Sequence, residues 1–217
     1  MRRLFSVVVV ASLIGVVAAC SQNPAGPSGG APSVSGSLST LVDVPIAVSV
    51  TDGLVGTWNY VGQSVTTPAG SSFGNVHFAW YHYNPRGETT AFGRIYVLDR
   101  EYLGLPGDLS SATPGFLARS EPERSGMSNA QGSEYTLPSS LTLAGNTKYW
   151  FYTDTQGAFA NSFDLDIYPG GNMWHTGYHA LAFYQSKASG RMVNGVFVPA
   201  PPGVTIDANF RLRGTTR

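Results

Sequence analysis

From about residue 43 to its end, the chain consists of short apolar or alternating runs separated by clusters of glycine, proline and other turn-forming residues. The clearest alternation is IDANFRLRG near the C-terminus, with Ile206, Ala208, Phe210 and Leu212 on one face and Asp207, Asn209, Arg211 and Arg213 on the other. Successive residues of a β-strand point to opposite faces. The pattern therefore predicts a half-buried strand with a solvated outer face.

Similar runs recur along the chain and predict further strands in WNYVGQSVTT, VHFAWYHY, FGRIYVL, SLTL, KYWFYTD, FDLDIY, YHALAFYQSK and VNGVFVP. VHFAWYHY and KYWFYTD are apolar or aromatic on both faces, so we expect them in the middle of sheets. About ten short strands with such turns between them are typical of a sandwich or barrel. We predict an all-β fold, a single-domain antiparallel β-sandwich of jelly-roll-like topology.

The N-terminus has the pattern of a secretory signal peptide. Residues 1–19, MRRLFSVVVVASLIGVVAA, join a basic start to an apolar run that ends in small residues. The run is shorter than the roughly 20 apolar residues that span a bilayer comfortably. Val17-Ala18-Ala19-Cys20 resembles the lipobox of bacterial lipoproteins, in which the cysteine is acylated and becomes the first residue of the mature chain. The alternative is an ordinary signal peptide followed by a chance cysteine.

Residues 20–42 follow as a candidate tether. The segment after Cys20 is rich in Ser, Gly, Pro and Ala, which bury too little surface to offset the entropy of ordering. We expect a signal peptide over residues 1–19, a lipidated cysteine with a flexible tether over 20–42, and a folded domain over 43–217. The protein is then lipid-anchored in the bacterial cell envelope. Ser21, where aspartate would favour retention at the inner membrane, favours the outer membrane.

Composition excludes several classes of protein. Cys20 is the only cysteine, so the mature fold has neither an intramolecular disulfide nor a zinc–cysteine site. The 13 basic residues of the chain, against 13 acidic ones, include Arg2 and Arg3 of the signal peptide, so the mature chain is slightly acidic. We therefore expect no nucleic-acid partner. No feature of the sequence specifies an oligomeric state.

Segments spread over most of the domain resemble the bacterial surface domains called choice-of-anchor domains, often found in PEP-CTERM proteins. The likeness lies in GQSVTTP at 62–68, GRIYVL at 93–98 leading into YLGLP at 102–106, LAGNTKYWF at 143–151, DIYPGG at 166–171 and DANFR at 207–211. The resemblance implies a jelly-roll-like sandwich on an exported, surface-attached protein. It implies no catalytic or ligand-binding residue.

Trp174 is the first candidate for ligand binding. It lies between Gly171 and Gly177 beside the polar residues Asn172 and His175. An exposed indole in such a loop could stack on the apolar face of a sugar ring, with Tyr168 or Tyr178 as a second platform. The alternative is that Trp174 caps an open end of the sandwich core.

A pair of carboxylates, Asp164 and Asp166, is the second candidate. Two positions apart on one strand face, their carboxyl groups would lie roughly 6–8 Å apart, which overlaps the separation found in inverting glycosidases. With a carbonyl near Gly170 the pair could instead hold a structural calcium ion. The plainer alternative is a solvated strand face. We expect no other cofactor.

Three functions remain open from the sequence. The first is a non-catalytic binding or adhesion module, with glycans among its candidate ligands. The second is a structural envelope or matrix protein that contacts another protein. The third is a hydrolase that acts on polysaccharide through Asp164 and Asp166. Because no motif of a catalytic triad or phosphate-binding loop occurs, we expect a protein that is not an enzyme.

The lipobox generates a direct prediction. Cys20→Ala removes the thiol that would carry the lipid, so the variant should lose labelling by a fatty acid and remain unprocessed or be released. Metabolic labelling and membrane fractionation measure this. Equal membrane retention of the variant would contradict lipid anchoring, and recovery of the wild-type protein with the inner membrane would contradict the outer-membrane assignment.

Overall fold

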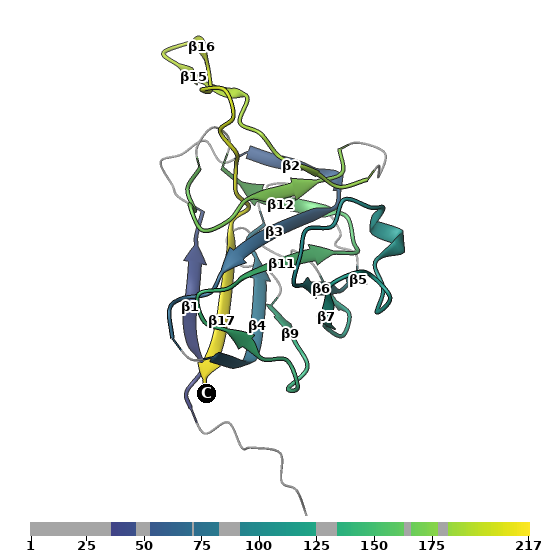
Figure 1. Ribbon diagram of the computed structural model, residues 1–217. Helices are drawn as coiled ribbons and strands as arrows, with labels where there is room; N and C mark the ends of the chain where they lie inside the picture. The colour runs from purple at the N-terminus through teal and green to yellow at the C-terminus, as the bar shows by residue number, and fades with distance from the viewer. Residues whose placement is uncertain are drawn as a thin grey trace, which may run out of the picture. The chain divides into compact units, whose positions relative to one another are not determined.

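The computed structural model describes residues 36–46, 53–70, 72–82, 92–124, 134–162, 166–177 and 182–217. These residues form strands and one short 3-10 helix, η1 (Pro106–Asp108). Two antiparallel sheets lie face to face, and the strands of one cross those of the other (Figure 1). The predicted single-domain antiparallel β-sandwich is therefore confirmed. Residues 1–35, with Cys20, and two predicted site residues, Asp164 and Tyr178, lie outside the described residues.

The first sheet follows the order β1-β17-β4-β10, and β9 also pairs with β4. Its strands are β1 (Ser39–Val44), β17 (Phe210–Thr216), β4 (Ser72–Trp80), β10 (Leu143–Ala144) and β9 (Glu134–Thr136). The second sheet follows the order β14-β13-β3-β11-β6-β7. Its strands are β14 (Tyr184–Gln185), β13 (Met173–His175), β3 (Val61–Thr66), β11 (Lys148–Thr153), β6 (Ile95–Leu98) and β7 (Phe116–Arg119).

The connectivity of these strands is that of a jelly roll. Taken in chain order, β1, β3, β4, β6, β7, β9, β11 and β17 divide into the rows β1-β17-β4-β9 and β3-β11-β6-β7. The first of these eight strands pairs with the last in the first row, and the second pairs with the seventh in the second row. The third then pairs with the sixth in the first row, and the fourth with the fifth in the second row. This order of pairs is the double Greek key of jelly rolls. β13 and β14 extend the second row beyond β3, and β10 pairs with the end of β4.

Three two-stranded ladders complete the described structure. They are β2 (Gly53–Asn59) with β12 (Gly157–Asn161), β5 (Phe92–Gly93) with β8 (Glu123–Arg124), and β15 (Gly190–Val193) with β16 (Val196–Pro199). The β15–β16 hairpin projects from one end of the sandwich, and β1 begins at the opposite end, beside the end of β17 (Figure 1). Among the described residues, no helix is long and apolar enough to cross a membrane.

Aromatic rings join the two sheets in the core. Phe78 of β4 stacks on Phe151 of β11 across the sandwich, with ring centroids 4.5 Å apart and an angle of 12° between the planes. Phe210 of β17 stacks beside Phe78 at 5.7 Å, and all three side chains are completely buried. Offset and edge contacts between aromatic rings add to the free energy gained from burial.

The two runs that are apolar on both faces take the predicted places. β4 lies between β17 and β9, and β11 lies between β3 and β6. In β11, Phe151 points into the core between the sheets, whereas Tyr152 points to the outer face and packs in a second, smaller cluster. A strand needs apolar side chains on both faces when both are covered.

Several sequence predictions differ from the structure. β1 begins at Ser39 and pairs with β17, so residues 39–42 belong to the sheet rather than to the tether. Asp207 and Asn209, expected on a solvated face, are fully buried, because β17 begins only at Phe210 and the preceding segment packs inside. FDLDIY is only partly described, and its residues 166–168 lie outside any strand.

Candidate functional site

Trp174 is buried, not exposed. It lies on β13 between β3 and β14, and its side chain is 3% exposed. The indole Nε1 donates a hydrogen bond to Glu101 Oε1 at 2.7 Å, and the ring packs at 6.5 Å from the ring of Tyr152. An indole covered in this way cannot stack on a sugar. The predicted platform at Trp174 is therefore wrong, and the ring fills a core.

The segment that covers Trp174 comes from another part of the chain. Residues 99–115 cross the outer face of the second sheet, where Tyr102 N donates to the hydroxyl of Tyr152 at 2.9 Å. Phe183 N donates to Gly104 O at 3.0 Å, which joins this loop to the residue that precedes β14. Beneath them lies the second apolar cluster, formed by Tyr96, Leu98, Leu109, Tyr152, Trp174 and Phe183. The outer face of the second sheet is thus a small apolar core covered by this loop, and it offers no exposed aromatic ring at Trp174.

Tyr168 and Asn172 also have internal partners. The Tyr168 hydroxyl donates to Thr66 O at 2.9 Å and accepts from Thr66 N at 3.0 Å, and its ring meets Phe210 edge-on. Asn172 Oδ1 accepts from Thr205 Oγ1 at 2.6 Å. A Cβ at Gly171 would collide with Ser64 O, so this turn presses directly on β3. These groups fasten the loop after residue 166 to the sheet, and Tyr178 lies outside the described residues.

His175 lies at the edge of an exposed apolar surface. Its ring is half-buried and contacts the ring of Tyr184 with centroids 4.3 Å apart, while Nδ1 accepts from Gly177 N at 3.3 Å. Burial lowers the pKa of His175, which favours the neutral imidazole at neutral pH. Tyr184 is 47% exposed, and the neighbouring loop exposes Leu103 and Leu105. We call these four residues the Leu105–Tyr184 surface.

The carboxylate that neighbours Asp166 is Asp207. Asp166 is exposed, whereas Asp207 is fully buried. Asp207 Oδ1 accepts from Gln63 Nε2 at 3.0 Å, and Oδ2 accepts from Tyr168 N at 3.0 Å. The described residues contain no group of three His, Cys, Asp or Glu side chains that could hold a metal ion, and Asp164 is not among them. A calcium ion at Asp164 and Asp166 stays a prediction.

Burial changes the chemistry of Asp207. Removal from water raises its pKa to about 7, and the nearby Asp166 carboxylate adds to the rise, while the hydrogen bonds from Gln63 and Tyr168 oppose it. Gln63 Oε1 in turn accepts from Ala208 N at 2.9 Å. One polar group inside the sandwich thus connects β3, the loop at Tyr168 and the segment before β17. These hydrogen bonds hold the three segments together around a fully buried carboxyl group.

The sequence contained a signal for this buried group. Gln63 lies two positions from Val61 and two from Val65, so the period of a strand places it on the same inward face as the two valines. A polar side chain that points into a core needs a partner. The partner, Asp207, could not be recognised from the sequence, because the alternation at 206–213 places it on the solvated face.

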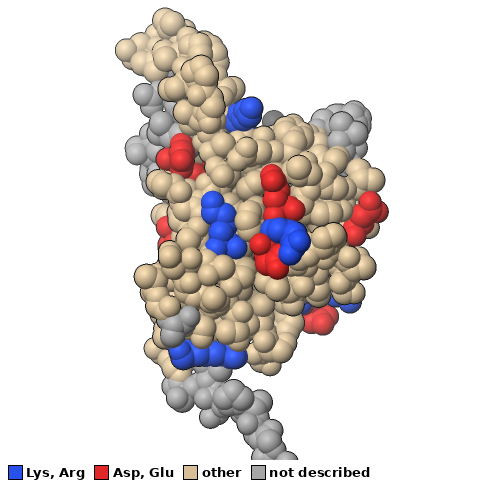
Figure 2. Space-filling view, in the orientation of Figure 1, with Lys and Arg blue, Asp and Glu red and all other residues tan. Residues whose placement is uncertain are grey.

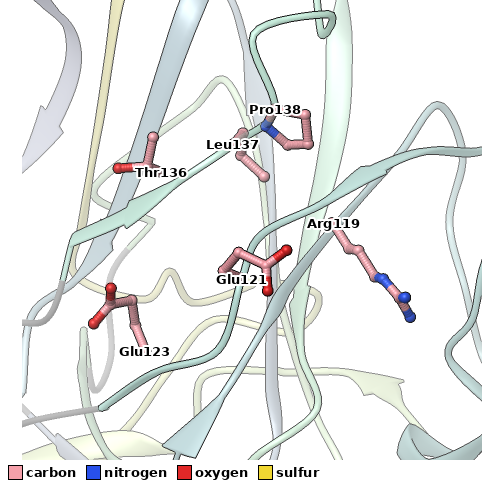
Figure 3. Close-up of a pocket in the computed structure, with 6 residues that line it drawn as sticks. All are labelled: Arg119, Glu121, Glu123, Thr136, Leu137 and Pro138. Atoms are coloured by element: carbon pink, nitrogen blue, oxygen red, sulfur yellow. The ribbon is translucent and has the colours of Figure 1, made fainter. Parts of the chain in front are cut away.

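A hollow of about 350 Å³ lies where β7 and β8 approach β9. It is lined by Arg119, Glu121, Glu123, Thr136, Leu137 and Pro138. Figure 3 shows the guanidinium of Arg119 turned away from the carboxylates of Glu121 and Glu123. Apart from Leu137, the lining residues are exposed. Its walls therefore place no convergent, desolvated groups around a bound molecule.

No protein-family model matches the sequence, and a search of curated proteins finds no significant match. The resemblance to choice-of-anchor domains rests on the quoted segments and stays a prediction.

Truncation of Trp174 should cost stability rather than binding. Trp174→Ala empties part of a core and leaves Glu101 without its donor, so we expect a loss of about 3–5 kcal/mol in the free energy of unfolding. Urea denaturation measures this. Tyr184→Ala, on the paired strand but with a half-exposed ring, is the control and should cost far less. An unchanged midpoint for Trp174→Ala would mean that the indole is not part of a core.

Asp207 should make the domain less stable as the pH rises from about 4 to 7. Its pKa is about 7 in the folded chain against an ordinary value of 3.8. Between these values the folded state binds more protons than the unfolded state, so the free energy of unfolding falls with rising pH and levels off above 7. Urea denaturation at a series of pH values measures the slope.

Two variants separate the causes of this slope. Asp207→Asn cannot ionise and should lose this part of the decline, even if the amide fits its two donors less well. Asp166→Asn should only reduce it, since burial is the larger cause of the raised pKa. The same slope in wild type and Asp207→Asn would show that the carboxyl group does not titrate in this range.

Proposed function

We propose that this protein is a lipid-anchored, non-catalytic module of the bacterial cell envelope that contacts another protein through the Leu105–Tyr184 surface. The anchor part rests on the lipobox at Cys20. The binding part rests on one observation: Leu103 and Leu105, which are 55% and 48% exposed, project from a loop whose backbone is tied to the sandwich.

The ties of this loop are specific. Tyr102 donates through its hydroxyl to Leu105 O at 2.8 Å, and Asp108 N donates to the same oxygen at 3.0 Å. Tyr102 N and Gly104 O bind Tyr152 and Phe183 of the second cluster, as described above. The leucines are therefore presented by an ordered loop. A contact surface that is already ordered loses little entropy on binding.

The kind of side chain favours a protein partner. The most exposed large residues here are leucines, with the Tyr184 ring beside them, and exposed apolar patches mark sites of contact with proteins or membranes. A glycan site would need flat rings and convergent polar groups, and the indole expected to supply the ring is buried. This favours the second of the three functions considered from the sequence.

A glycan remains a second candidate because of one observation. The Tyr184 ring is half-exposed and backed by His175, which is an arrangement that can support a sugar ring. The third function, hydrolysis of polysaccharide, has less support. The described neighbour of Asp166 is the buried Asp207, which a polysaccharide cannot reach.

Site-specific photo-cross-linking in cells tests the protein contact. A photoreactive residue in place of Leu105 in the full-length chain should give a discrete protein adduct, and the additional substitution Leu103→Ser should reduce its yield. The matched control is the same residue in place of Ser111, an exposed position further along the loop. Equal adducts at both positions, or none at 105, would contradict the proposal. Loss of polysaccharide retention in Tyr184→Ala but not in Leu105→Ser would favour the glycan.

A further inference from the structure

The β15–β16 hairpin exposes an apolar strand to solvent. Asn194 and Gly195 form its turn, both with positive φ, at 48° and 79°, as in the two-residue turns that suit the twist of a hairpin. Val196, Phe197 and Val198 of β16 are 64%, 54% and 44% exposed, and Val193 before the turn is 38% exposed. In Figure 1 the hairpin stands clear of the sandwich, and in Figure 2 its tip shows no charged group.

Both faces of β16 are open to solvent. Successive residues of β16 point to opposite sides, and every one of them is exposed, so neither side packs on the domain. β15 and β16 pair only with each other among the described residues. A protein surface that packed against such a ribbon would cover one face and leave the other exposed to water. A lipid interface that surrounds the hairpin would cover both faces.

The charged residues of the hairpin and its flanks are all basic. Between Lys187 and Ile206 the sequence holds two basic residues, Lys187 and Arg191, and no acidic one. Lys187 is exposed and bridges to Thr205 at the stem, on the side of the domain. Hydrogen bonds from Ala188 N to Val204 O and from Ala200 N to Ser189 O close this stem at 2.9 and 3.3 Å. A basic stem behind an apolar tip complements anionic headgroups above hydrocarbon.

The backbone after the hairpin suits the same environment. Residues 199–202 read PAPP, so three of four positions carry no N–H donor. An unpaired donor that leaves water is costly in a lipid interface. The segment that leads from the end of β16 into the stem therefore has few donors to satisfy.

We propose that the β15–β16 hairpin inserts, tip first, into the interface of a lipid bilayer that contains anionic lipids. The apolar side chains Val193, Val196, Phe197 and Val198 enter the headgroup and acyl region, and Lys187 stays at the headgroups. This contact uses residues other than the Leu105–Tyr184 surface and does not depend on the lipid at Cys20.

Binding to vesicles tests the proposal. The chain from residue 20 to 217, with Cys20→Ser so that no acyl group contributes, should co-sediment with vesicles of equal parts phosphatidylcholine and phosphatidylglycerol. Binding to phosphatidylcholine alone should be weaker, and salt or Lys187→Gln should weaken binding to the mixed vesicles. Phe197→Ser should reduce the affinity roughly tenfold or more, because it removes an inserted aromatic ring.

Leu117→Ser is the matched control, since Leu117 of β7 is an exposed apolar side chain (39% exposed) that lies outside the Leu105–Tyr184 surface. It should leave vesicle binding unchanged, while both variants keep the wild-type urea midpoint. No binding to mixed vesicles, or an equal loss for both variants, would overturn the proposal. So would sedimentation that shows the hairpin holding copies of the chain together in the absence of lipid, with Phe197→Ser dissociating them. Because the cross-linking at Leu105 uses another surface, failure of one test leaves the other unaffected.

Discussion

The stack of Phe78 on Phe151 is the contact on which the sandwich depends, because it joins the central strand of one sheet to a central strand of the other. The chain has one cysteine, Cys20, which precedes the domain, so no disulfide can hold the layers together. Burial of apolar surface has to supply the stability instead. Around the stack, Phe210 and the edge-on ring of Trp80 complete an aromatic centre. The other layers of the molecule are built outward from this contact.

The polar link at Asp207 follows from how that core is closed. β17 contributes Phe210 and Leu212 to the interior, and the segment before it has to enter the sandwich to bring them there. Its backbone N–H groups then need buried acceptors. Gln63 accepts from Ala208 N and donates to Asp207, so an amide in the middle of β3 satisfies a segment far away in the sequence. The buried carboxyl group and its raised pKa are consequences of that arrangement.

Local sequence patterns predicted the architecture better than they predicted exposure. The strands at VHFAWYHY and KYWFYTD were placed correctly in mid-sheet, because residues that are apolar on both faces report two covered faces. In IDANFRLRG, buried and half-exposed residues alternate as predicted from Phe210 onward. The pattern does not predict that another segment covers the polar side, as happens at Asp207.

The predicted exposure of Trp174 is wrong for the same reason. Its neighbours in sequence are polar and glycine-rich, yet the loop that covers it lies some seventy residues earlier and supplies Glu101, which accepts the hydrogen bond from the indole. Exposure depends on contacts between distant segments, which local composition does not record. The exposed hairpin at 190–199 shows the converse case. VNGVFVP predicts a strand and a turn, but not that the strand has no neighbouring layer.

The chain enters and leaves the domain at the same end. Ser39 at the start of β1 pairs with Gly214 near the end of β17, and Arg217 N donates to Ser72 O beside them. The β15–β16 hairpin lies at the other end (Figure 1). A fluorescent protein or affinity tag fused after Arg217 would therefore lie beside the start of β1 and leave the far end unobstructed. An epitope inserted between Asn194 and Gly195 would instead be displayed at that far end, so the two insertions report on opposite poles of one domain.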